Sequence, residues 1–146
     1  MLLPDKGVGL FAFASRTYAG ASLPAFRAML ALNKAGALED RKTPVSPGLA
    51  TAYDAARAVW RTGGIAAAPL ANNMLMDRDV PRWKTLIEGL KKEVGACRMD
   101  EAITPVSAME GKFAWTCEHG RIAGRVQRAP TPEVTLQALE FAVQAP

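Results

Sequence analysis

The side chains that could carry out chemistry are few in this chain and far apart in its sequence. His119 is the only histidine, and histidine is the side chain whose ordinary pKa lies nearest to neutral pH. Because it precedes a glycine between two stretches of alternating apolar residues, we expect His119 in an exposed hairpin turn. Asp77 and Asp79 could form a pair of carboxylates, but capping of the helix that follows already explains Asp79. These residues therefore do not identify a catalytic site.

Metal and cofactor sites are not expected either. Cys97, Cys117 and His119 are fewer ligands than a structural zinc site requires. Gly7 and Gly9 lack the third glycine and the helix of a phosphate-binding turn. A disulfide between the two cysteines would close a loop of about twenty residues, and a bond that closes a loop of this length contributes about 3 kcal/mol to stability. The alternative is two separate buried thiols, because a free cysteine behaves as a small apolar residue.

Three segments have the apolar spacing of amphipathic helices: residues 22–36, 46–63 and 79–95. Ser46 is a good N-cap for the second helix, and Pro47 suits its first turn. Asp79 caps the third helix, and Gly95 is suited to end it. These signals fix the ends of both helices.

Beyond Cys97 the apolar residues alternate, as in strands with one buried face. We expect strands at residues 102–109, 113–117, 121–128 and 134–143. In the last of them the alternation slips by one residue at Ala138, which predicts a bulge or a strand that is exposed differently along its length. Helices followed by three or four antiparallel strands predict an α+β fold with the helices on one face of the sheet.

This order of elements resembles the cone-shaped folds of the ketosteroid-isomerase and cystatin-like groups. Such folds can hold a small-molecule pocket between sheet and helix. The resemblance implies that isomerase-like chemistry would need a carboxylate on the concave sheet face in apolar surroundings. The acidic residues near the strands lie at strand ends or on polar faces: Glu118, Glu133 and Glu140.

Residues 1–20 predict a hairpin that is too apolar to stand alone. Pro4, Asp5 and Gly7 favour a tight turn between a short strand and a second, fully apolar strand that includes residues 10–14. A two-stranded hairpin is marginal in water unless further strands or a helix cover it. We therefore expect this hairpin to join a sheet.

The same residues carry a resemblance to a known family. Residues 3–9, Leu-Pro-Asp-Lys-Gly-Val-Gly, followed by Leu-Phe-Ala-Phe-Ala-Ser-Arg-Thr-Tyr, resemble the last hairpin of the penicillin-recognising serine hydrolases. That family includes class C β-lactamases, low-molecular-weight penicillin-binding proteins, and related esterases and D-aminopeptidases. The resemblance implies that the hairpin belongs to a central antiparallel sheet and that the remaining residues form an appended C-terminal region. The family's usual periplasmic setting favours a disulfide between Cys97 and Cys117.

The three catalytic motifs of that family are missing from this chain. In Ser-x-x-Lys the lysine helps to deprotonate the serine hydroxyl, but no serine here has a lysine three residues later: Ser15, Ser22, Ser46 and Ser107. Tyr18 and Tyr53 do not begin a Tyr-x-Asn motif. Residues 42–44 and 119–120 are only near misses to Lys-Thr-Gly and His-x-Gly. We therefore carry over no catalytic residue and expect no activity from the chain alone.

Composition and charge limit the partners. The formal net charge is +4 and the pI is about 9.3, but lysine and arginine are scattered, so we expect no nucleic-acid binding. The apolar run at residues 10–14 is far shorter than the about 20 residues that span a bilayer, so we expect no transmembrane segment. Polar residues 39–44 predict a linker. We expect a terminal hairpin at 1–20, a helix and linker at 21–44, and an α+β domain at 45–146.

Two functions from different classes are compatible with these residues. In the first, the chain is a non-catalytic accessory domain of a β-lactamase-like serine hydrolase, periplasmic or secreted. Its partners would be the catalytic domain or a second copy that covers the apolar hairpin. In the second, it is a self-contained α+β module that binds or isomerises a small apolar ligand. We prefer the first, because residues 1–20 match a pattern and the second lacks an identifiable base.

Overall fold

The computed structural model of the chain describes residues 1–16, 18–40 and 42–144. The chain divides into two compact units, Met1–Lys42 (unit 1) and Thr43–Pro146 (unit 2). Thr17, in the segment that follows the expected hairpin, and Arg41, in the expected linker, lie outside the described residues.

The described residues of unit 1 form a short hairpin and one helix. Strands β1 (Leu2–Leu3) and β2 (Val8–Gly9) are antiparallel, and the 3-10 turn η1 (Pro4–Lys6) joins them. Gly7 ends this turn with a φ of 65°, a left-handed conformation that favours glycine. Helix α1 (Ser22–Lys34) follows, so the helix expected at 22–36 is confirmed.

The prediction of an apolar strand over residues 10–14 is wrong. Strand β2 ends at Gly9, and Leu10 still exchanges backbone hydrogen bonds with Met1. Residues 11–14 extend beyond Met1 in the hairpin register, so no residue of the hairpin lies opposite them. Residues 11–14 are not part of a strand.

Both helices of unit 2 begin and end where the sequence predicts. Helix α2 (Pro47–Thr62) begins after Ser46, whose hydroxyl accepts a hydrogen bond from Leu49 N at 3.1 Å. Helix α3 (Val80–Val94) begins after Asp79, whose carboxylate accepts from Arg82 N at 2.9 Å. Gly63 and Gly95 follow the two helices with positive φ. Satisfied backbone N–H groups fix the N-terminal ends.

Among the residues described, the sheet of unit 2 has five antiparallel strands, in the order β3-β5-β6-β7 with β4 beside β5. Their bounds are Cys97–Arg98 for β3, Thr104–Pro105 for β4, Glu110–Cys117 for β5, Gly120–Arg128 for β6 and Leu136–Gln144 for β7. The α+β fold is confirmed, with five strands where we expected three or four. The strand expected at 102–109 shrinks to β4, because the hydroxyl of Ser107 accepts from Met109 N and Glu110 N and turns the chain there.

The irregularity expected in the last strand is present. The register between β6 and β7 shifts between Gln127, opposite Ala138, and Arg128, opposite Leu136. Gln137 is therefore the additional residue. This bulge brings Leu136, Leu139 and Phe141 into the core despite the slip in their alternation.

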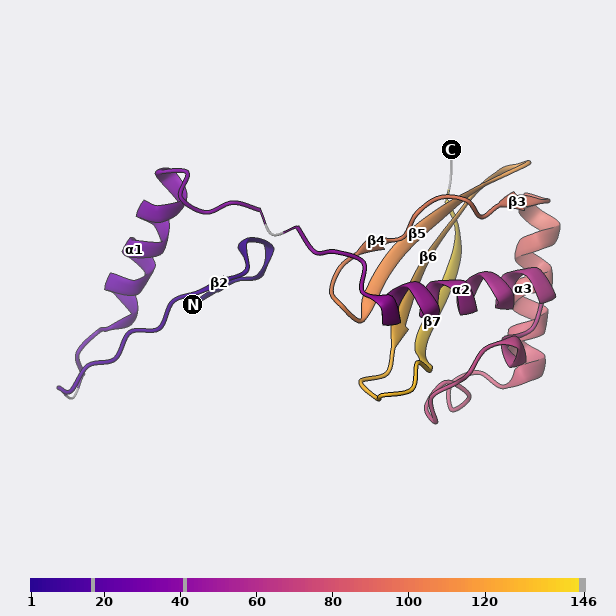
Figure 1. Ribbon diagram of the computed structural model, residues 1–146, viewed down its shortest axis with the longest axis horizontal. Coiled ribbons are helices and arrows are strands. Elements are labelled where there is room, and N and C mark those ends of the chain that lie inside the picture. The colour runs from indigo at the N-terminus through magenta and orange to yellow at the C-terminus, as the bar shows by residue number, and fades with distance from the viewer. Residues whose placement is uncertain (17, 41, 145–146) are drawn as a thin grey trace. The chain divides into compact units, whose positions relative to one another are not determined.

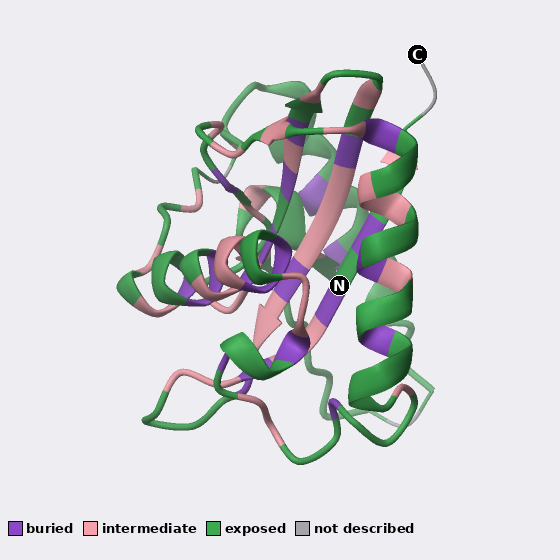
Figure 2. Ribbon diagram, turned by 90° about the vertical axis from the view of Figure 1, so that its right-hand side faces the viewer, coloured by how far each residue is buried: buried purple, intermediate pink, exposed green. Residues whose placement is uncertain are grey.

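Helices α2 and α3 lie on the same side of this sheet (Figure 1). Their buried residues face the strands, and the outer sides of the helices are exposed (Figure 2). The opposite face of the sheet, formed by alternate residues of β5, β6 and β7, carries polar and small side chains. We call these two sides the inner and outer faces of the sheet. None of the described helices is long and apolar enough to cross a membrane.

Candidate functional site

The titratable side chains considered from the sequence do not come together in unit 2. His119 lies exposed in the two-residue turn between β5 and β6, and its backbone N–H bonds Val94 O at 2.9 Å. Asp79 caps α3, whereas Asp77 lies in the preceding loop. Among the described residues, no three histidine, cysteine, aspartate or glutamate side chains are grouped to hold a metal ion.

The three glutamates of the strand region are also spread out. Glu118 accepts a hydrogen bond from Ala96 N at 3.0 Å, at the end of α3. Glu133 is exposed in the loop before β7. Glu140 lies on the outer face of the sheet, 3.1 Å from Arg125. None of the three faces the apolar interior where an isomerase-like base would act.

The inner face of the sheet is filled by aromatic rings. The ring centroids of Phe113 and Trp115 are 4.6 Å apart in a stacked pair. The rings of Trp60 and Phe141 have centroids 5.7 Å and 5.8 Å from that of Trp115. Each of these side chains is at most 8% exposed. A ligand between helix and sheet would have to displace these rings, so this region serves as core.

A buried hydrogen-bonded chain crosses this core. Trp115 Nε1 donates to the hydroxyl of Tyr53 at 2.8 Å, and that hydroxyl donates to Glu101 O at 2.7 Å. Arg57 also donates to Glu101 O and lies 4.0 Å from the ring centroid of Tyr53. The chain ties α2 and β5 to the loop between β3 and β4, so its role is structural.

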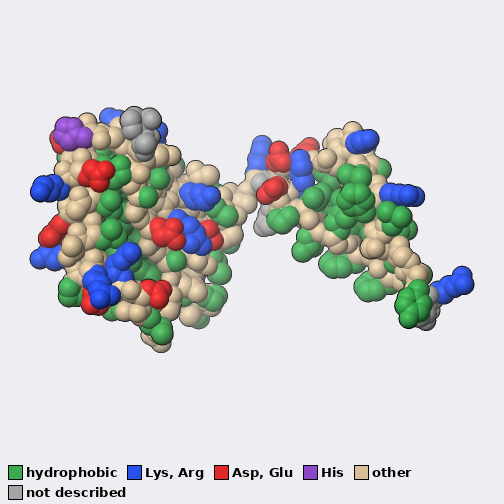
Figure 3. Space-filling view, turned by 180° about the vertical axis from the view of Figure 1, so that it is seen from behind, with side chains coloured by type: hydrophobic (Ala, Val, Ile, Leu, Met, Phe, Trp, Pro, Cys, Tyr) green, Lys and Arg blue, Asp and Glu red, His purple; other side chains and the backbone are tan. Residues whose placement is uncertain are grey.

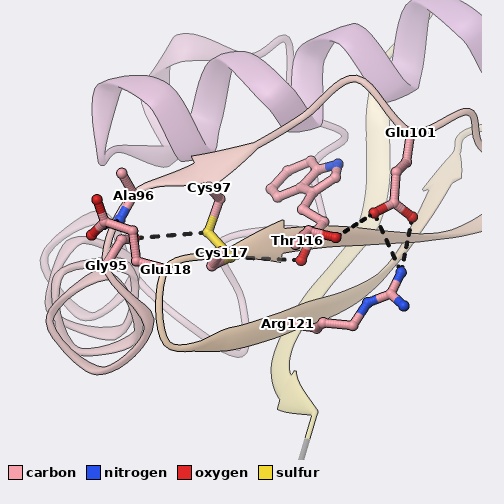
Figure 4. Close-up of a disulfide and its surroundings, with 9 residues drawn as sticks. Gly95, Ala96, Cys97, Glu101, Thr116, Cys117, Glu118 and Arg121 are labelled. Atoms are coloured by element: carbon pink, nitrogen blue, oxygen red, sulfur yellow. Dashed lines mark hydrogen bonds and ion pairs between the residues drawn. A yellow bond between two sulfur atoms is a disulfide. The ribbon is translucent and has the colours of Figure 1, made fainter. Parts of the chain in front are cut away.

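Cys97 and Cys117 form a disulfide, as favoured from the sequence (Figure 4). The two cysteines lie directly opposite each other on β3 and β5. Glu118 N bonds Ala96 O next to them, which makes the cysteines a non-hydrogen-bonded pair with closely spaced side chains. The bond attaches a strand of only two residues to the edge of the sheet.

Ion pairs lie on the outer face of the sheet, around a band of small apolar side chains (Figure 3). Arg125 Nε donates to Glu110 at 2.7 Å and its Nη1 to Glu140 at 3.1 Å. The hydrogen bond from Arg125 lowers the pKa of Glu110, although partial burial opposes this shift. Glu101 forms a second group, bonded to Thr116 at 2.9 Å and to Arg121 at 2.9 Å (Figure 4).

The sequence alone did not predict these ion pairs. Glu110 and Arg125 are fifteen residues apart and belong to different strands. A register for β5 and β6 could have suggested them, because it places Lys112 opposite Arg125 and Glu110 two pairs further along, on the same face of the sheet. The sequence fixes the facing side chains only once that register is known.

Unit 1 has a surface of a different kind, rich in exposed apolar side chains (Figure 3). Phe11 is 73% exposed and Phe13 94% exposed. On α1 the exposed fractions are 52% for Leu23, 46% for Phe26 and 45% for Leu30. We call these five side chains the apolar surface of unit 1. It is the strongest candidate for a functional site in the described residues, because its chemistry suits the binding of another apolar surface.

No protein-family model, curated protein or solved structure matches this chain. The resemblance of residues 1–20 to serine hydrolases therefore rests on the sequence pattern.

Proposed function

We propose that this chain is the non-catalytic C-terminal part of a penicillin-recognising serine hydrolase. In this proposal, unit 1 completes the central sheet of the catalytic domain, and unit 2 is an accessory domain. The observation that carries the proposal is the exposure of Phe11 and Phe13 on a segment that, within the described part of the chain, has no strand beside it. Such a segment can add to the edge of another sheet through its backbone.

Burial of the two phenylalanine rings would stabilise such a pairing. Burying one such side chain contributes roughly 1.5–3 kcal/mol. Phe11 and Phe13 alternate with Ala12 and Ala14, so in an extended strand both rings would lie on one face. A catalytic domain that pairs with this strand would bury both rings in the same layer.

Helix α1 supports the same interpretation. Ala25 and Met29 are buried within unit 1, whereas Leu23, Phe26 and Leu30 are exposed. The exposed residues are three and four positions apart, so they form one face of the helix. A helix with apolar residues on both a covered and an uncovered face is suited to lie between two layers.

The features of unit 2 are compatible with an accessory role. Its inner face is filled by aromatic side chains, which disfavours the alternative of an apolar-ligand module. Its disulfide is typical of periplasmic and secreted proteins. We therefore propose that unit 2 shapes access to the catalytic domain or mediates assembly.

Activity-based labelling tests the proposal in the source cells. Cells are treated with a fluorophosphonate probe, which reacts with activated serines, and extracts are precipitated with an antibody against residues 43–146. We expect a labelled polypeptide, continuous with this chain or bound to it, whose labelled serine lies in a Ser-x-x-Lys sequence. Precipitation of this chain without such a labelled serine would refute the proposal.

A second experiment examines the purified chain. We expect no hydrolysis of a chromogenic ester or cephalosporin above the buffer rate. The double variant Phe11→Ser/Phe13→Ser should bind less of an environment-sensitive apolar dye than the wild type. Met76→Ser is the matched control, because Met76 is 81% exposed on unit 2. Hydrolysis by the chain, or equal dye binding by the Phe11→Ser/Phe13→Ser variant, would count against the assignment.

A further inference from the structure

The two edges of the sheet in unit 2 are built differently. One edge consists of β3 and β4, each only two residues long. The disulfide holds β3, and Pro105 in β4 has no backbone N–H to offer a further strand. Short strands and proline are devices that keep a sheet edge from pairing with other chains. This edge is therefore protected.

The other edge, β7, lacks these devices (Figure 1). Its first residue, Leu136, exchanges hydrogen bonds with Pro69 O and Ala71 N, and Asn73 bonds Gln137 O. From residue 138 to residue 144, the described residues provide no backbone partner beyond the β6 ladder. This stretch contains no proline and one charged residue, Glu140. Its backbone groups have no other partner in the described chain, and residues of the loop at 73–78 line a hollow beside its first part, residues 138–140.

We propose that β7 pairs with β7 of a second copy of this chain, in antiparallel orientation, to form one continuous sheet. The two-fold axis passes through Phe141, the central residue of the free stretch 138–144. This proposal concerns unit 2 and does not rest on the serine-hydrolase assignment.

Side-chain chemistry selects this register. Paired residues point to the same face of a sheet, so inward Leu139 meets Val143 and outward Glu140 meets Ala142. An axis through Glu140 would instead bring two carboxylates together, which is destabilising. An axis through Ala142 would pair only residues 140–144 of the described stretch with one another. Only the register centred on Phe141 pairs the whole stretch without opposing like charges.

A second copy suits this edge better than an unrelated strand, because the edge complements itself. The symmetric pairing places the same surface on both subunits, as in most two-fold dimers. The exposed side chains of the edge, Glu140, Ala142 and Gln144, face only small or polar partners in it. Nothing in the structure matches these side chains to the sequence of an unrelated strand.

Charge changes at Ala142 test both the interface and its register. Ala142 is exposed and lies opposite Ala123 in its own sheet, so either charge can be accommodated in the monomer. Ala142→Glu would place a carboxylate opposite Glu140 of the second copy, twice per dimer. Ala142→Lys would place an ammonium group there instead. The measurement is sedimentation of the full chain, in a Phe11→Ser/Phe13→Ser background that removes association through unit 1.

We expect the background protein to sediment at twice the chain mass of 15.6 kDa. Ala142→Glu should weaken the dimer by about tenfold, because like charges directly opposite are destabilising. Ala142→Lys should leave it unchanged or tighter, and Glu140→Lys should restore dimerisation of the Ala142→Glu variant. Thermal melts of each variant verify folding. A monomeric background protein, or equal effects of the two Ala142 variants, would overturn the proposal.

Discussion

At the scale of single residues, the hydroxyl of Tyr53 has the most demanding position in unit 2. It accepts from buried Trp115 Nε1 and donates to Glu101 O, so its removal leaves both groups without this partner. An unpaired buried polar group costs about 1–3 kcal/mol. The hydroxyl thus compensates for placing an indole N–H in an aromatic core.

We therefore expect Tyr53→Phe to lower the free energy of unfolding by about 2 kcal/mol, since it deletes only this hydroxyl. Urea unfolding followed by tryptophan fluorescence measures the change. Tyr18→Phe is the control, because Tyr18 is the only other tyrosine and is fully exposed. Equal stability of the two variants would show that the hydrogen-bonded chain is not formed in solution.

The ion pair between Glu110 and Arg125 predicts a dependence on pH. Arg125 lowers the pKa of Glu110 in the folded state, so the pair stabilises the fold above the unfolded pKa of about 4.3. This contribution is lost as the pH falls through the lower, folded pKa. Glu110→Gln should destabilise the protein by about 0.5–1 kcal/mol at neutral pH and by less in acid.

Urea unfolding of both proteins at neutral and acidic pH measures this difference. The control is Glu133→Gln, which alters an exposed glutamate in the loop before β7. If Glu110→Gln lowered the free energy of unfolding by the same amount over the whole pH range, this result would contradict the assignment of the ion pair.

At the scale of elements, the disulfide compensates for the small size of β3. The strand contributes only the pairs Cys97–Cys117 and Arg98–Thr116 to the sheet. The covalent bond keeps these pairs in register and holds the chain that leaves α3. Without it, the edge would depend on a few hydrogen bonds.

Removing the disulfide should therefore cost more than removing any ordinary contact at this edge. We expect Cys97→Ala/Cys117→Ala to lower the free energy of unfolding by about 3 kcal/mol, the value for a closed loop of this length. Chemical unfolding with and without a reductant measures it. Reductant should destabilise the wild type and leave the variant unaffected; a wild type insensitive to reductant would disprove a stabilising disulfide.

Some boundaries of the elements can be predicted from the local sequence alone. Ser46, Asp79, Gly63 and Gly95 mark helix ends through interactions within a few residues, and the predicted helices are confirmed. The slip at Ala138 likewise located a bulge in β7. The strand expected at 102–109 failed, because a serine side chain formed a turn that the alternation of apolar residues does not reveal.

At the scale of the whole molecule, the chain joins a unit with its own core to one with an exposed apolar surface. The buried hydrophobic cluster extends from Leu49 to Phe141 and lies entirely within unit 2. Unit 1 buries only Ala25 and Met29 among its described residues. Stability should therefore be distributed very unequally along the chain.

Limited proteolysis measures this difference in stability between the two units. We expect trypsin to cleave first after Lys42, which is exposed at the boundary of unit 1, and a fragment beginning at Thr43 to accumulate. Mass spectrometry identifies the fragment, and its thermal melt should match the main transition of the full chain. Early cleavage within the sheet of unit 2 would contradict an independent core.

The sequence by itself determined the helices of unit 2, the α+β class and the unsatisfied apolar character of residues 1–20. These properties follow from contacts between near neighbours and from the period of the apolar residues. The tertiary structure alone decided which strands face which. It thereby decided the pairing of Glu110 with Arg125, the filling of the inner face by rings, and the free edge at β7. Register and burial depend on residues distant in sequence, whose proximity no local pattern encodes.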